Sequence, residues 1–90
     1  MFRILLAVTG IPAQEGPAGA ECIEREFAHR PWHSNVKCVW DGARLTLQAE
    51  NDFDSNGLAL IDEFSDAISA CLRNVGDGSI EVLSVTSLPA

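Results

Sequence analysis

The chain has 90 residues, of which 47% are hydrophobic and 21% charged, and this ordinary globular composition predicts a single folded domain over residues 1–90. Thirteen acidic residues against six basic ones give a formal net charge of −7. That charge argues against nucleic acid or an anionic membrane as a partner, because neutralising phosphates requires an excess of Lys and Arg. The longest apolar run, residues 4–8, is far shorter than the roughly 20 residues that cross a bilayer. The acidity instead permits a basic protein partner or a cation.

The first predicted element is a strand over residues 2–9. Its apolar residues fall on both faces, with Ile4, Leu6 and Val8 on one of them, which is typical of a central strand. The charged residue and apolar run at the start also resemble a signal peptide. Turn formers and an acid in residues 11–16 interrupt that pattern and favour the strand.

A loop is predicted from Gly10 to Gly16, a position where strand-to-helix connections often hold anions. It has neither the lysine of a phosphate-binding loop nor the glycine spacing of a dinucleotide-binding loop, so we expect a plain connection, with a small-ligand site as the alternative. The first helix is expected to begin at Pro17 and to end before Pro31. Its apolar stripe comprises Ala20, Ile23 and Phe27, with Cys22 alongside.

A hairpin is predicted next, because the dipeptide Asp41-Gly42 lies between two alternating runs and favours a two-residue turn. The predicted pairs on its core face are Trp40 with Ala43, Cys38 with Leu45, and Val36 with Leu47.

A second amphipathic helix is predicted after residues 51–56. Its apolar stripe comprises Ile61, Phe64, Ile68, Cys71, Leu72 and Val75. Arg73 in the last turn and Gly76 just beyond it are ordinary helix stop signals.

The last strand is predicted over residues 79–87, after a turn at Asp77-Gly78. If Ile80 and Val82 face inward, the sheet face away from the helices is apolar. Its expected apolar residues are Leu5, Ala7, Val39, Leu83 and Val85. A contiguous patch of this kind marks a partner or self-association surface, so we expect a homodimer through this open sheet face, with an unpartnered face as the alternative.

The order of elements is strand, helix, strand, strand, helix, strand. Over nearly the whole chain it resembles the ferredoxin-like split βαβ arrangement. This resemblance implies an α+β two-layer sandwich, with two helices on one face of a four-stranded antiparallel sheet. Many unrelated functions use this fold, so the function must be sought in the side chains.

Residues 52–63 match the spacing of a calcium-binding loop. Its oxygens would come from Asp52, Asp54 and Asn56, its sharp turn from Gly57 and its bidentate carboxylate from Glu63. The context differs, because residues 43–50 alternate as a strand where a calcium loop is preceded by a helix. We therefore expect Asp54 or Ser55 to cap the second helix, with calcium binding as the alternative and no metal site assigned.

The chain has three cysteines: Cys22, Cys38 and Cys71. An odd number without a C-x-x-C spacing favours reduced thiols, and hence a cytoplasmic protein, over a disulfide framework or a zinc site. His29 and His33 are separated by Pro31, which breaks the helix that would place both on one face. Neither a transition-metal site nor a Cys–His nucleophile pair is predicted.

The acidity is concentrated in one segment. No Lys or Arg occurs between Arg44 and Arg73, and residues 45–72 hold six acids, so this segment carries −6 of the net charge. The candidate partner-binding residues are Glu50, Asp52, Asp54, Asp62, Glu63 and Asp66, together with Trp32. Trp32 is a candidate aromatic anchor, with a cap on the end of the core as the alternative.

These features predict a small acidic protein-binding module without a cofactor, because no catalytic constellation is evident in the sequence. Its concrete form would be an immunity-type inhibitor that covers the active site of a basic nuclease toxin, with charge complementarity speeding capture. The competing hypothesis is a regulatory domain, in dimeric form, that binds a small molecule or Ca²⁺.

Overall fold

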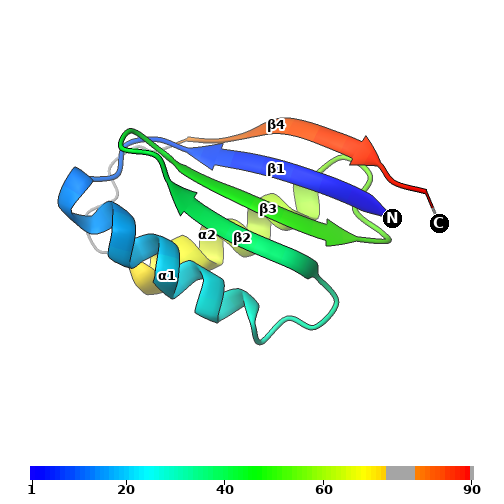
Figure 1. Cartoon of the computed structure of the whole chain (residues 1–90), viewed down its shortest axis with the longest axis horizontal. Coiled ribbons are helices and arrows are strands. Elements are labelled where there is room, and N and C mark those ends of the chain that lie inside the picture. The colour runs from blue at the N-terminus through cyan, green and yellow to red at the C-terminus, as the bar shows by residue number, and fades with distance from the viewer. Residues whose placement is uncertain (73–78, 90) are drawn as a thin grey trace.

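A computed structural model describes residues 1–72 and 79–89 and confirms the predicted α+β architecture with its ferredoxin-like βαββαβ order (Figure 1). The elements are β1 (Phe2–Val8), a short 3-10 turn η1 (Ala13–Glu15), α1 (Gly16–Phe27), β2 (Ser34–Trp40), β3 (Leu45–Asn51), α2 (Leu58–Cys71) and β4 (Ile80–Ser87). The strand order is β2-β3-β1-β4, and all neighbouring strands are antiparallel.

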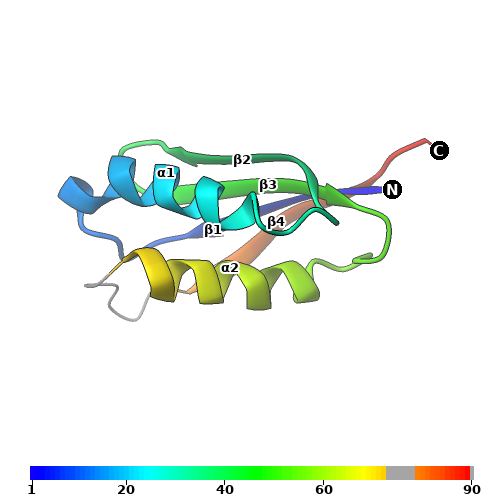
Figure 2. The same cartoon turned by 90° about the horizontal axis from the view of Figure 1, so that it is seen from below.

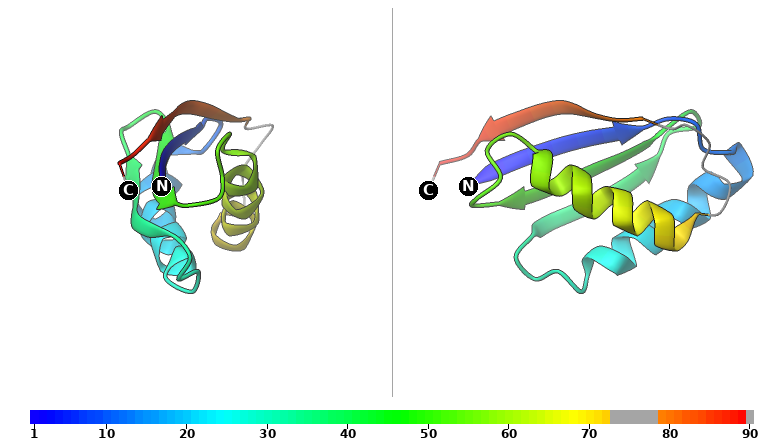
Figure 3. Two further views of the ribbon diagram at one scale, coloured as in Figure 1. Left: turned by 90° about the vertical axis from the view of Figure 1, so that its right-hand side faces the viewer. Right: turned by 180° about the vertical axis from the view of Figure 1, so that it is seen from behind.

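The two helices cover one face of the sheet and form the second layer (Figures 2 and 3). The core between the layers includes Ile4, Leu6 and Val8 from β1, Ile23 and Phe27 from α1, Leu45 and Leu47 from β3, and Leu60 and Phe64 from α2. None of the helices in the described ranges is long and apolar enough to span a membrane.

Strand β1 lies in the middle of the sheet, between β3 and β4, as its two apolar faces predict. Ile4, Leu6 and Val8 point toward the helices and are buried. The start of β1 and the end of β4 lie side by side, and there the Leu88 N–H donates to the Met1 carbonyl at 2.8 Å (Figure 1).

The predicted loop from Gly10 to Gly16 is partly wrong, because residues 13–15 form the turn η1 and the helix begins at Gly16. The turn forms because the Glu15 N–H donates to the Pro12 carbonyl at 2.9 Å. At Gly16 the helix passes directly over the Trp40 ring, which a Cβ atom at this position would overlap.

The hairpin between β2 and β3 confirms the predicted faces, but the predicted register is wrong. Cys38 pairs with Leu47 rather than with Leu45, a shift of two positions. The cause is the Asp41 carboxylate, which accepts the backbone N–H groups of Ala43 and Arg44 at 2.9 and 2.8 Å and moves the tip of the turn onto Gly42-Ala43. Since side chains alternate with a period of two, this shift leaves each residue on its predicted face.

Strand β4 contains a bulge that the sequence pattern did not predict. Leu5 pairs with Ser84 and Leu6 with Val82, so Leu83 has no partner on β1. The extra residue reverses the alternation. Val82 faces the helices as expected, but Val85 faces them too and packs against the core, so its predicted place on the open face is wrong.

Helix α2 ends at Cys71, and the backbone at Leu72 is extended although its side chain is buried in the core. The predicted stripe residue Val75, the stop signals Arg73 and Gly76, and the Asp77-Gly78 turn lie outside the described residues.

The prediction of three reduced thiols is wrong, because Cys22 of α1 and Cys71 of α2 form a disulfide across the helix layer. The two helices bring together cysteines that lie 49 residues apart in the chain, which no local spacing indicates.

Candidate functional site

A polar cluster joins the connection between α1 and β2 to helix α2, and Glu63 lies at its centre. The Trp32 indole N–H donates to Glu63 Oε1 at 3.1 Å, and His33 Nε2 lies 2.5 Å from Glu63 Oε2. Arg30 Nε is 3.7 Å from Glu63 Oε1. These residues, with Asn51 at the end of β3, are called the Glu63 cluster below.

The hydrogen bonds of Asn51 determine which nitrogen of His33 carries the proton. Asn51 Oδ1 accepts the backbone N–H groups of Phe53 and Asp54 at 3.2 and 2.9 Å, so its amide nitrogen must face His33. That nitrogen donates to His33 Nδ1 at 3.3 Å. A neutral His33 therefore carries its proton on Nε2 and donates it to Glu63.

His33 is fully enclosed, with no exposure of its side chain, because aromatic rings surround it. The ring centroids of Phe27, Trp32 and Phe53 lie 5.6, 6.0 and 6.1 Å from that of His33. Phe27 belongs to the core, whereas Trp32 and Phe53 are 51% and 52% exposed. The cluster thus holds two large aromatic side chains at the surface.

Three of the six predicted partner-binding acids are engaged inside the molecule. Glu50 is buried on β3, where Arg3 and Asn35 each donate to its carboxylate at 2.9 Å. These two hydrogen bonds, that of Asn35 first, hold the pKa of Glu50 below its ordinary value. Asp54 is also buried, and Glu63 belongs to the cluster above.

The other three predicted acids, Asp52, Asp62 and Asp66, are exposed to solvent. Asp62 and Asp66 lie one turn apart on the outer side of α2, and Asp52 directly precedes Phe53. Half of the six predicted acids are therefore exposed, and they lie on or next to the elements that carry the Glu63 cluster.

The residues that match the calcium-loop spacing instead cap the start of helix α2. The Asp54 carboxylate accepts the N–H groups of Leu60 and Ala59 at 2.9 and 3.3 Å, which confirms the predicted capping role. Asn56 Oδ1 accepts the Leu58 N–H at 3.0 Å. With Glu63 directed at His33, these oxygens do not converge, and within residues 1–72 and 79–89 no three His, Cys, Asp or Glu side chains meet in a metal-binding group.

The open sheet face is more polar than predicted, because the bulge removes Val85 from it. Leu5 has polar neighbours on both sides, Gln48 on β3 and Ser84 on β4. Ala7 lies between Thr46 and Glu81.

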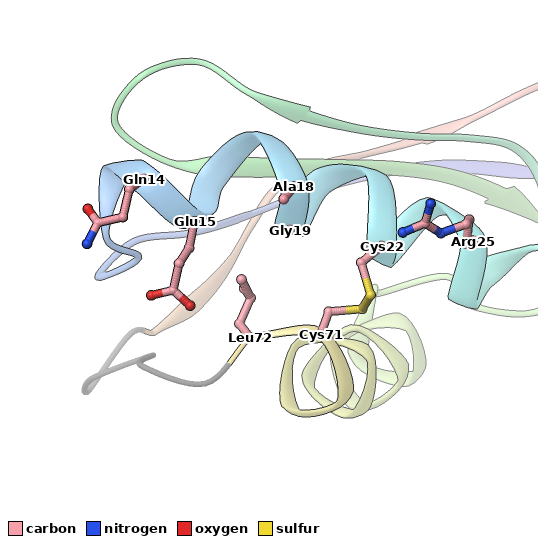
Figure 4. Close-up of a pocket in the computed structure, with 8 residues that line it drawn as sticks. All are labelled: Gln14, Glu15, Ala18, Gly19, Cys22, Arg25, Cys71 and Leu72. Carbon is pink, nitrogen blue, oxygen red and sulfur yellow. A yellow bond between two sulfur atoms is a disulfide. The ribbon is translucent and has the colours of Figure 1, made fainter.

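A groove of about 390 Å³ lies between α1 and the end of α2 (Figure 4). Its lining residues are Gln14, Glu15, Ala18, Gly19, Cys22, Arg25, Cys71 and Leu72.

The third cysteine, Cys38, is buried in the core, where burial and then the nearby charge of Glu24 raise the pKa of its thiol to about 12. A thiol of this kind is inert.

Sequence reasoning selected Trp32 and Glu63 separately but missed their contact, and it missed the roles of His33 and Asn51. These residues come from segments about 30 positions apart, so no local period links them. Comparisons of the chain with family models, with curated proteins and with solved structures find no match.

Proposed function

We propose that this chain is a small acidic protein-binding module whose contact surface is centred on Trp32. The observation that carries the proposal is that the exposed side chains of Trp32 and Phe53 both lie beside the enclosed His33 ring. Large aromatic side chains that are held in place at a surface dominate the energies of protein interfaces. Glu63 fixes the position of Trp32 by accepting a hydrogen bond from its indole N–H.

The charge around this surface indicates a basic partner. Asp52 precedes Phe53, and Asp62 and Asp66 are exposed on α2, whereas Arg30, the cation of the Glu63 cluster, is already paired with Glu63. Opposite charges on a partner would speed its capture and favour it over acidic proteins. An immunity-type inhibitor of a basic nuclease toxin is the concrete form of this proposal.

A binding role is favoured over a catalytic one because the polar groups of the Glu63 cluster are already engaged with one another. Glu63 accepts from Trp32 and His33, and Nδ1 of His33 accepts from Asn51. A general base needs an atom free to take a proton from a substrate.

The disulfide gives an argument about the cellular compartment in which the chain functions. Disulfides persist in oxidising compartments and are rare in the cytosol, so the bond between Cys22 and Cys71 weighs against the cytoplasmic location that reduced thiols predicted. We propose that the chain works in an oxidising compartment. Alkylation of free thiols in intact native cells, before lysis, tests this: protection of both cysteines supports it, and alkylation of both refutes it.

The test of the binding proposal is capture from native cells with the full chain as bait, at low and at high salt. Trp32→Ala is expected to weaken capture of a basic protein at least about tenfold, and Asp62→Asn with Asp66→Asn to remove most of its salt dependence. Glu21→Gln, which removes an exposed acid from α1, is the matched control and should leave capture unchanged. Equal losses in the Trp32 and Glu21 variants, or no salt-dependent partner at all, would refute the proposal.

Two measurements address the competing hypotheses. Calorimetric titration with Ca²⁺ tests the calcium loop, and a signal abolished by Glu63→Gln would revive it. A light-scattering mass tests self-association through the open sheet face, since a dimer that Val39→Lys dissociates would establish that face as the interface.

A further inference from the structure

The groove between α1 and the end of α2 lies apart from the Glu63 cluster and contains a disulfide bond. The Cys22–Cys71 disulfide forms part of its lining, and both cysteines are partly exposed. Figure 4 places the disulfide between Arg25 at one end of the groove and Glu15 at the other. A solute that enters the groove therefore meets the two sulfur atoms and a charged group together.

Among the described residues that line this groove, Arg25 is the cation. It lies one turn after Cys22 on α1, and Figure 4 shows its guanidinium directed back along the helix toward Cys22. Arg3, Arg30 and Arg44 each pair with a carboxylate, whereas Arg25 makes no ion pair within the part of the chain that the structure describes. The guanidinium of Arg25 can donate two hydrogen bonds to the carboxylate of a solute.

We propose that this groove is a thiol–disulfide exchange site for small thiols that carry a carboxylate. Arg25 holds the carboxylate while the thiolate of the solute attacks Sγ of Cys71. The bond between Cys71 and Cys22 breaks as the new bond between Cys71 and the solute forms, and Cys22 leaves with the electron pair as a thiolate. One disulfide replaces another, so no further oxidant or reductant takes part.

The direction of the exchange follows from the charges beside the two cysteines. Arg25 stabilises a thiolate on Cys22, whereas Cys71 is the last residue of α2, at the negative end of the helix dipole, which disfavours negative charge. The sulfur that is the more stable thiolate leaves faster. The mixed disulfide therefore forms on Cys71.

The third cysteine does not compete in this exchange. Cys38, on β2, is buried in the core and its thiol has a raised pKa, so it neither attacks nor accepts an incoming thiolate at neutral pH. Any adduct with the folded chain is thus confined to Cys22 and Cys71.

The test compares three small thiols on the full, oxidised chain: mercaptopropionate, mercaptoethanol and cysteamine. The rate of mixed-disulfide formation is measured by intact mass after acid quenching and is expressed per concentration of thiolate. A net charge of −7 by itself repels the anionic thiol and attracts the cationic one, which would make cysteamine fastest. The proposal expects the reverse at low salt, with mercaptopropionate about fivefold faster than mercaptoethanol.

Substitution of Arg25 separates its role from the general reactivity of the disulfide. In the Arg25→Gln variant, cysteamine should form the mixed disulfide fastest. In the Lys37→Gln variant, which lacks an exposed positive charge of β2, mercaptopropionate should remain the fastest. Peptide mapping of the wild-type adduct should place it on Cys71.

Four results would overturn the proposal: cysteamine fastest with the wild-type chain, equal shifts in the two variants, an adduct on Cys22, or the absence of any mixed disulfide. None of these results tests binding at the Trp32 surface, so failure of this proposal would leave the proposed function unaffected, and the reverse.

Discussion

Glu63 joins α2 to the connection between α1 and β2, and the substitution Glu63→Ala removes this link while leaving the helix intact. The carboxylate accepts from His33 and Trp32 and pairs with Arg30. Alanine is a strong helix former, so the variant tests these contacts and not the propensity of α2.

The largest loss is expected at His33. Its side chain is fully buried, so removal of Glu63 leaves the Nε2–H donor without its partner, which costs about 1–3 kcal/mol. The contacts of Trp32 and Arg30 are more exposed and add about 0–1 kcal/mol. The expected loss of unfolding free energy is about 2–3 kcal/mol, equivalent to a decrease in Tm of about 10–20 °C for a domain of this size.

Urea unfolding followed by tryptophan fluorescence measures this loss, with Asp62→Ala as the matched control. Asp62 is the exposed neighbour of Glu63 on the same helix, and its removal should change the unfolding free energy by less than about 0.5 kcal/mol. If both variants unfold at the same urea concentration, the Glu63 cluster does not stabilise the fold and the reasoning fails.

Three further predictions concern other parts of the fold. The pKa of Glu50 lies below its ordinary value of 4.5, so the stability it contributes is complete above that pH and is lost as the pH falls through the folded-state pKa. Glu50→Gln should therefore flatten the acid side of a urea-midpoint profile between about pH 5 and pH 3, and an unchanged slope would contradict this. Gly16→Ala places a Cβ against the Trp40 ring and should cost about 1–3 kcal/mol of unfolding free energy, with an altered Trp fluorescence spectrum; a gain in stability would contradict it. Replacing both Cys22 and Cys71 by Ser releases a constraint across 49 residues and should lower the unfolding free energy by about 2–4 kcal/mol, whereas an unchanged thermal midpoint would argue against the bond in the native chain.

The architecture was predictable because it depends on which face each residue presents. The alternation over residues 2–9 placed Ile4, Leu6 and Val8 against the helices, and the apolar stripe of the first helix identified Ile23 and Phe27 as core. Burial enforces these patterns locally, through periods of two and 3.6 residues, so they can be read without knowledge of the partners.

The errors in strand pairing arise where a single local contact overrides the pattern. The Asp41 carboxylate moved the hairpin register by two positions, and the bulge at Leu83 turned Val85 inward. Both changes keep apolar side chains buried, so the hydrophobic pattern cannot distinguish them from the predicted pairing.

The candidate site depended on tertiary structure more than the fold did. Trp32 and the exposed acids of α2 were identifiable from residue type and charge, but their relation to His33 was not. The segment with six acids resembled one binding surface, yet Glu50 and Asp54 are buried beside hydrogen-bond donors, and the acids exposed to solvent in the described part of the segment are Asp52, Asp62 and Asp66.

By itself the sequence determined the order of elements, the buried faces and the concentration of negative charge between β3 and the end of α2. Tertiary structure decided that Glu63 meets His33 and that Cys22 meets Cys71. The physical reason is that burial acts on each residue through its own side chain. A hydrogen bond or a disulfide instead requires two particular atoms from distant segments to meet within about 3 Å.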